Sequence, residues 1–319
     1  MQYKRINVKA LTKVLKILIP IVSLFIVVYQ IRSNDEVDME FFKNFMTSLD
    51  VKALLFLLLT LLLVFFNWGS EAMKWKLLIS KIEKVSFKTS FKAVTAGITA
   101  SIIIPFHAGE YLGRITFLKN KIRGTILTTV CSVSQLLITL LFGLIGLLFF
   151  NTDIEDFNLL WIILSTFIVA MLLLYSLINF DDWFGRFLPV KIRKYFKVLS
   201  VINYKRLLLK VFLLSVLRFI VFSSQYIIIF KCYGLPFSEV NLFFAIALMY
   251  LSMTFIPINK VVELGTTRSL MLISLFQLLP NWDPKYEMLV VLSTFTIWLF
   301  NIVIPASYGG FVMLLKKVD

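Results

Sequence analysis

Charged residues are scarce in this chain. Of its 319 residues only 16% are charged, whereas 59% are hydrophobic, and the mean hydropathy is +0.89. Soluble domains carry about 25% charged residues, so this composition excludes a soluble globular protein. Stretches such as residues 53–66 are apolar on every face, which suits a lipid-embedded helix, whereas the strands of a membrane barrel alternate apolar and polar residues. We therefore expect an all-α polytopic membrane protein.

Residues that bind metals or form disulfides are also rare. The chain has one histidine, His107, and two cysteines, Cys131 and Cys232, which have no metal-ligand spacing. We expect no metal, no disulfide and no cofactor. The net charge of +15 comes from basic residues spread between apolar runs. Such spacing is typical of membrane orientation and contact with anionic lipid, so nucleic acid is not expected as a partner.

Long apolar runs predict six membrane spans. Each is long enough to cross the bilayer at 1.5 Å per residue, and together they cover about residues 14–29, 52–75, 125–150, 158–180, 207–230 and 288–315. Two further apolar segments, roughly residues 93–118 and 240–278, are interrupted by proline and charged residues. Hydropathy alone leaves open whether these two cross the membrane or turn back.

The distribution of Lys and Arg favours turning back, because these residues collect in cytoplasmic loops. If both interrupted segments are re-entrant, the loops on one side carry 22 Lys and Arg and the loops on the other side carry 4. If only the first segment crossed, the seven cations of residues 181–206 would be exported. We therefore predict two broken re-entrant hairpins, with both termini cytoplasmic in an integral cell (inner) membrane protein.

Opposite entry of the two hairpins predicts two inverted-topology repeats, residues 52–150 and 207–315, within one transmembrane domain of residues 1–319. The sequence supports the repeat at its breaks. Ile104-Pro105 and Ile256-Pro257 are each followed by a glutamate and then an arginine. The rest of the chain would then serve as scaffolding for these two breaks.

Proline suits the first position of a helix, so Pro105 and Pro257 are expected to begin the second half of each hairpin. Free backbone N–H groups and the positive end of the helix dipole would favour an anion there. Beyond the first break, Glu110 and Arg114 are spaced i, i+4 with His107 on the same face. His107 could shuttle protons or hydrogen-bond the broken backbone.

Other membrane-depth charges add to these candidates. Lys260 and Glu263 are spaced i, i+3, with Arg268 following, and Arg218 lies deep in its span. Lys210 is nearer the span end and can extend its amine to the interface. A charge at the bilayer centre costs about 2.5–3.5 kcal/mol, so pairing or ligand contact is implied.

Structural alternatives stay open for several of these residues. The Glu–Arg and Lys–Glu pairs could simply hold the hairpins closed. Glu71, beside Lys74 and Lys76, is interpreted as an ion-pair partner at the cytoplasmic end of its span, and Trp75 as an interfacial aromatic. Four polar side chains within spans are interpreted as helix-to-helix hydrogen-bond partners: Asn67, Gln135, Gln225 and Asn301.

The run from Pro105 to Glu110, the following Arg114 and the preceding stretch from Glu71 to Leu78 resemble the flippase-like transmembrane family, which includes the membrane region of lysylphosphatidylglycerol synthases. The resemblance implies a lipid-handling membrane domain. It adds Gly109 to the site, which then comprises, as substrate-binding residues, Pro105, His107, Gly109, Glu110, Arg114, Arg218, Pro257, Lys260, Glu263 and Arg268. Because the chain stops at Asp319, the soluble aminoacyl-transfer domain of the synthases, and hence lysyl transfer, is not expected.

The leading hypothesis is a lipid flippase-like protein that binds or translocates an anionic phospholipid head group in a mid-membrane groove. The alternatives are a membrane-embedded lipid-modifying transferase and a scaffold for a separate lipid synthase. No loop exceeds about 25 residues, too short for a donor-binding domain, and no catalytic constellation is evident, so an enzyme is the less favoured reading. The sequence leaves open a homodimer and a separate lipid-modifying enzyme as partners.

Overall fold

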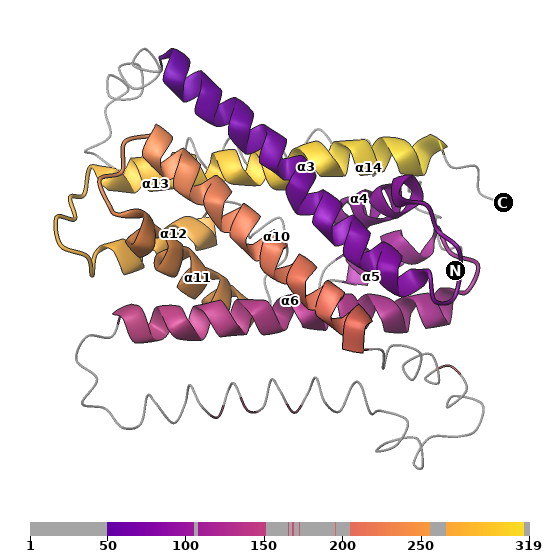
Figure 1. Cartoon of the computed structure of the whole chain (residues 1–319). Helices are drawn as coiled ribbons and strands as arrows, with labels where there is room; N and C mark the ends of the chain where they lie inside the picture. Colours follow the sequence, from indigo (N-terminus) through magenta and orange to yellow (C-terminus); the bar gives the residue numbers. More distant parts are fainter. Residues whose placement is uncertain are drawn as a thin grey trace, which may run out of the picture.

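The computed structural model describes residues 50–104, 108–150, 205–255 and 266–315, together with Ser165, Ile168, Leu172 and Tyr195. Every regular element in the four ranges is a helix (Figure 1). In chain order these helices are α3 (Val51–Ile79), α4 (Phe87–Ile103), α5 (Ala108–Ile115), α6 (Lys121–Phe150), α10 (Lys205–Cys232), α11 (Glu239–Phe255), α12 (Thr266–Phe276), α13 (Tyr286–Trp298), η2 (Leu299–Val303) and α14 (Ile304–Leu315). The predicted all-helical class is confirmed for this part of the chain.

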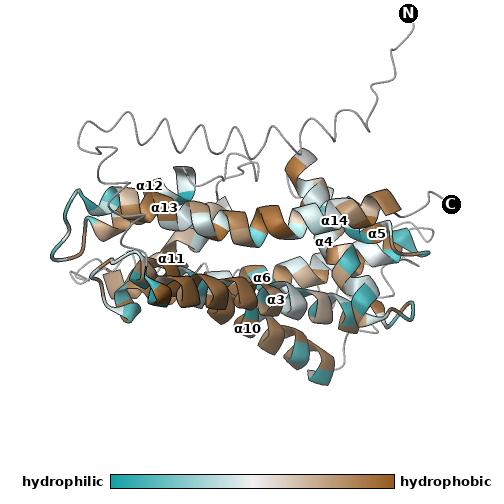
Figure 2. Cartoon of the chain, turned by 90° about the horizontal axis from the view of Figure 1, so that it is seen from above, coloured by the Kyte–Doolittle hydropathy of each residue, from teal (hydrophilic) through white to brown (hydrophobic). Residues whose placement is uncertain are grey.

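Four long apolar rods confirm four of the six predicted spans. They are α3, α6, α10 and the continuous rod formed by α13, η2 and α14, and each is long and apolar enough to cross a membrane. Hydrophilic residues gather toward the two ends of the bundle, both in loops and on helices, whereas much of the length of the long helices is hydrophobic (Figure 2). The spans predicted at residues 14–29 and 158–180 lie outside the described residues, apart from three isolated helical positions in the second.

Helix α3 has two different halves. Asp50 caps its start by accepting a hydrogen bond from the backbone N–H of Ala53 at 2.8 Å, and the leucines of the next turns are exposed. From Trp68 onward the helix carries many buried residues, including charged ones. The interpretation of Trp75 as an interfacial aromatic was wrong, because its side chain is fully buried and donates to Thr128 Oγ1 at 3.0 Å.

Helices α3 and α10 pack against each other in antiparallel directions (Figure 1). Polar contacts mark the pairing along its length. Near the start of α3, Cys232 donates to the carbonyl of Ala53 at 3.7 Å, and further along Gln225 Nε2 donates to the carbonyl of Thr60 at 3.0 Å. Since the residue numbers rise on one helix as they fall on the other, the loops that follow α3 and α10 leave from opposite ends of the bundle.

Each of these loops leads into a pair of shorter helices. After α3, Ser86 caps α4 by accepting from the backbone N–H of Thr89 at 3.1 Å, and α4 ends at Ile103. Ile104 has extended backbone, as expected for the residue before a proline. After α10, α11 and α12 form the second pair. The predicted helix starts at Pro105 and Pro257 lie outside the described residues, where α5 is described from Ala108 and α12 from Thr266.

Glycines set the close contacts of these pairs. Gly109 and Gly113 lie one turn apart on α5, and a Cβ atom at either would clash with the backbone of α4. Each pair also packs on a long helix from the other half of the chain. Gly309 of α14 lies against the backbone of Thr95 in α4, while Gly143 of α6 lies against Leu251 in α11. The two halves therefore support each other's shorter helices.

Candidate functional site

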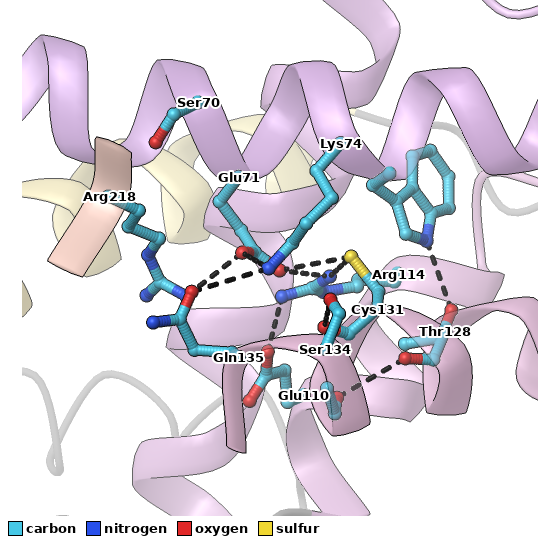
Figure 3. A network of polar contacts seen from close by, with 12 residues as sticks. Ser70, Glu71, Lys74, Glu110, Arg114, Thr128, Cys131, Ser134, Gln135 and Arg218 are labelled. Atoms are coloured by element: carbon cyan, nitrogen blue, oxygen red, sulfur yellow. Dashed lines mark hydrogen bonds and ion pairs between the residues drawn. The ribbon is translucent and has the colours of Figure 1, made fainter. Parts of the chain in front are cut away.

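A buried carboxylate, that of Glu71 on α3, lies at the centre of the network of polar contacts drawn in Figure 3. Glu71 Oε1 accepts from Arg114 Nη1 at 2.9 Å and from the thiol of Cys131 at 3.4 Å. Glu71 Oε2 lies 2.9 Å from both Lys74 Nζ and Arg218 Nη1. A carboxylate has about four lone-pair positions, so this one is saturated by partners from α3, α5, α6 and α10.

Local helix geometry places most of these groups. Glu71 and Lys74 are i, i+3 neighbours on α3, and Glu110 and Arg114 are i, i+4 neighbours on α5. The glycine face of α5 packs against α4, which leaves the Glu110 and Arg114 face to meet α3 and α6. Arg114 Nη2 donates to Glu110 Oε1, which confirms the predicted pair.

Burial differs across the cluster. The side chains of Lys74, Arg114 and Glu71 are 0%, 1% and 3% exposed, while those of Arg218 and Glu110 are 20% and 19% exposed. These five residues comprise three cations and two carboxylates, so the cluster has an excess of one positive charge. Charges buried among apolar helices are costly unless paired, so the cluster must form as a unit.

Neutral polar side chains complete the surroundings of Lys74. Its amine lies 3.2 Å from Ser215 Oγ on α10 and 3.4 Å from Gln135 Oε1 on α6. Ser134 and Ser215 hydrogen-bond each other at 3.1 Å. The Lys74 ammonium therefore has a partner for each of its three N–H bonds, because the Glu71 carboxylate supplies the third.

A second set of contacts surrounds Arg218. Its Nε donates to Asn67 Oδ1 at 3.2 Å, and its guanidinium carbon lies 4.8 Å from the centre of the Trp68 ring. Asn67 Nδ2 in turn donates to Asn301 Oδ1 at 2.8 Å, and Trp68 Nε1 donates to the Asn301 carbonyl at 2.9 Å. Arg218 is thus held by α3 directly and by the last span indirectly.

Several interpretations made from the sequence can be checked here. The four membrane-depth amides do form contacts between helices, as predicted for Asn67, Asn301, Gln135 and Gln225. Glu71 does pair with Lys74, as predicted, and it is 2% exposed at the centre of the cluster, a role that the sequence analysis did not assign to it. Its pairing with Arg114 and Arg218 required the tertiary structure.

The other predicted site residues fall into three groups. Arg268 is buried, lies over the Tyr250 ring and donates to the Tyr226 hydroxyl at 3.3 Å, two turns along α10 from Arg218. Gly109 is a packing residue against α4. The remaining five candidates lie outside the described residues: Pro105, His107, Pro257, Lys260 and Glu263. Among the described residues, no three His, Cys, Asp or Glu side chains gather closely enough to hold a metal ion.

Comparison with known families places this cluster in context. The family model described as the lysylphosphatidylglycerol synthase TM region matches residues 14–259, more than half of the chain. The chain belongs to this family. The membrane region of lysylphosphatidylglycerol synthases was also the resemblance found in the sequence, so that prediction is confirmed. No curated protein and no solved structure matches the chain.

Membership of the lysylphosphatidylglycerol synthase TM region family makes this an integral membrane protein, related to lipid synthesis and in contact with membrane lipids. The matched stretch contains Glu71 and each of its four partners, whereas Asn301 lies beyond it. The contact of Asn67 and Trp68 with the last span is therefore a feature that the family match does not describe.

Proposed function

We propose that this protein binds the head group of an anionic phospholipid at the Glu71 cluster and carries it between the two leaflets. The observation that supports the proposal most directly is the convergence of Lys74, Arg114 and Arg218 on one buried carboxylate. Ionisable residues at membrane depth are functional by default because their burial is expensive. An excess of positive charge favours an anionic ligand.

The ligand phosphate would compete with the carboxylates for the two arginines. Arg218 and Glu110 form the partly exposed edges of the cluster, so a head group would meet them first. Guanidinium groups bind phosphate through paired N–H donors, and such charge-assisted hydrogen bonds are the strong ones. Glu71 and Glu110 would hold the arginines in place without ligand, and Glu110 could exchange a proton as phosphate arrives.

We also propose that the two halves are inverted-topology repeats whose broken helices enter from opposite membrane faces. Two observations support this arrangement: α3 and α10 are antiparallel, and each pair of shorter helices packs on a long helix from the other half of the chain, α4 on α14 and α11 on α6. Rocking of one half against the other would expose the site alternately to each side. The helix starts and charges expected to complete the site are Pro105, His107, Pro257, Lys260, Glu263 and Arg268.

Reconstitution in liposomes tests the function. Liposomes would contain fluorescent phosphatidylglycerol or fluorescent phosphatidylcholine, and loss of outer-leaflet fluorescence on quenching would report translocation. Glu110→Gln and Arg114→Ala should slow phosphatidylglycerol movement to the protein-free rate. Lys210→Ala is the matched control, because Lys210 is an exposed cation on α10. The site assignment is wrong if both cluster variants translocate lipid as fast as the wild type while they elute as folded protein.

A further inference from the structure

The guanidinium of Arg218 is held at two of its three nitrogens and on one face. Its Nε donates to Asn67 and its Nη1 to Glu71, while its plane lies over the Trp68 ring. An arginine side chain offers five N–H donors in a fixed planar fork. Nη2 has no hydrogen-bond partner among the residues that the structure describes, and the side chain is 20% exposed. The outer edge of the fork is thus left for another acceptor.

The contacts that hold Arg218 in place depend on a proline in the last span, Pro305. In an α-helix the carbonyl of Asn301 would accept from the N–H of residue 305, but Pro305 has no N–H. The backbone widens here into the π-helical turn η2, and the Asn301 carbonyl accepts from Trp68 Nε1 at 2.9 Å instead. Such turns occur often at functional sites. The proline therefore frees the acceptor that anchors Trp68.

Asn301 also sets the orientation of Asn67. Its Nδ2 donates to the carbonyl of Ile297 at 3.2 Å, so its Oδ1 is the atom that faces Asn67 Nδ2. Asn67 must then direct its own Oδ1 to Arg218 Nε. Each amide has one orientation that satisfies both of its contacts. A chain of fixed hydrogen bonds consequently runs from η2 to the guanidinium.

The geometry points to Asn67, Trp68 and Asn301 as positioning residues that present the outer edge of Arg218 to the phosphodiester of an anionic lipid head group. This inference rests on the proposed function and adds a means of recognising the phosphate, while the excess positive charge of the cluster favours an anionic head group over a zwitterionic one. A fixed planar fork favours a phosphate group that accepts two hydrogen bonds, whereas a mobile point charge would not discriminate by shape. The alternative is that these residues only fasten α3 to the last span.

A double-mutant cycle separates the two readings. Dioctanoyl-phosphatidylglycerol is titrated into purified full-length protein in detergent, and affinity is measured for the wild type, Asn67→Ala, Arg218→Lys and the double variant. If Asn67 acts through Arg218, Asn67→Ala should weaken binding about tenfold in the wild type, the value of a hydrogen bond to a charged group. In the Arg218→Lys background the further loss should be about twofold or less.

Trp68 supplies a second test that keeps the protein folded. Trp68→Phe retains a ring beneath the guanidinium and should preserve most of the affinity, whereas Trp68→Leu should lose it. Equal effects of these two substitutions would refute a role for the ring face. Dioctanoyl-phosphatidylcholine and inorganic phosphate are titrated as comparison ligands, because they distinguish binding of an anionic lipid from binding of a zwitterionic lipid and of free phosphate.

The outcomes separate the inference from the proposed function. If Asn67→Ala weakens phosphatidylglycerol binding equally in both backgrounds, Asn67 is merely structural and the inference fails while the proposed function stands. If the wild type binds neither lipid, or binds both equally, the proposed function itself fails. Binding of inorganic phosphate as tight as that of phosphatidylglycerol would overturn the assignment to a lipid head group.

Discussion

Replacing Glu71 by glutamine should destabilise the protein strongly. The substitution Glu71→Gln keeps the shape of the side chain but removes the charge shared by Lys74, Arg114 and Arg218. Breaking one buried ion pair costs about 3–5 kcal/mol, because the remaining charge stays buried without its partner. Three cations depend on this carboxylate, so about 3 kcal/mol is a lower limit. Thermal unfolding in detergent should show a midpoint lowered by roughly 10 °C.

A second substitution tests the reason for that loss. Adding Lys74→Met to Glu71→Gln restores the original excess of one positive charge, with a side chain of similar volume. The double variant should therefore regain at least half of the lost midpoint. Glu239→Gln is the surface control, since Glu239 is a mostly exposed partner of Lys231, and its midpoint should not move. An unchanged midpoint for Glu71→Gln, or a further loss on adding Lys74→Met, would refute the electrostatic argument.

Two further outcomes are expected. Gly309→Ala should destabilise the protein by about 1–3 kcal/mol because its Cβ would meet the backbone of Thr95, whereas Gly69→Ala, with only ordinary contacts, should be neutral or slightly stabilising in the same thermal assay. Cys131 is fully buried against Glu71 and should react with a maleimide only after denaturation, while the half-buried Cys232 should react in the native protein. In a Cys232→Ser variant the remaining thiol is that of Cys131, so rapid labelling of the native variant would contradict the packing of α6.

The sequence predicted the long helices well because their signal is local. An apolar run of sufficient length has one stable form in lipid, and α3, α6, α10 and the last span follow from that rule. The Glu110–Arg114 pair was predictable for the same reason, since both residues lie on one turn of helix. Arg218 was recognised as a site candidate from its depth in the span.

The role of Glu71 was not predictable in this way. Counted along α3, Glu71 and Lys74 lie toward one end of the span, which suggested an interfacial pair. Their central position depends on how α5 and α10 pack against that end, and these contacts join residues 43 and 147 positions away. Pro305 was the local signal available for η2, because a proline inside a span implies an unpaired carbonyl four residues earlier.

The packing of α4 on α14, from the other half of the chain, has a consequence for biosynthesis. Thr99 on α4 donates to the carbonyl of Ala306 on α14, a residue 207 positions later in the chain. The first pair of shorter helices is therefore synthesised long before the helix that covers it. Until the last span has been synthesised, the Thr99 hydroxyl lacks this partner and α4 lacks its packing surface on α14, so truncation near the C-terminus should impair a helix made much earlier.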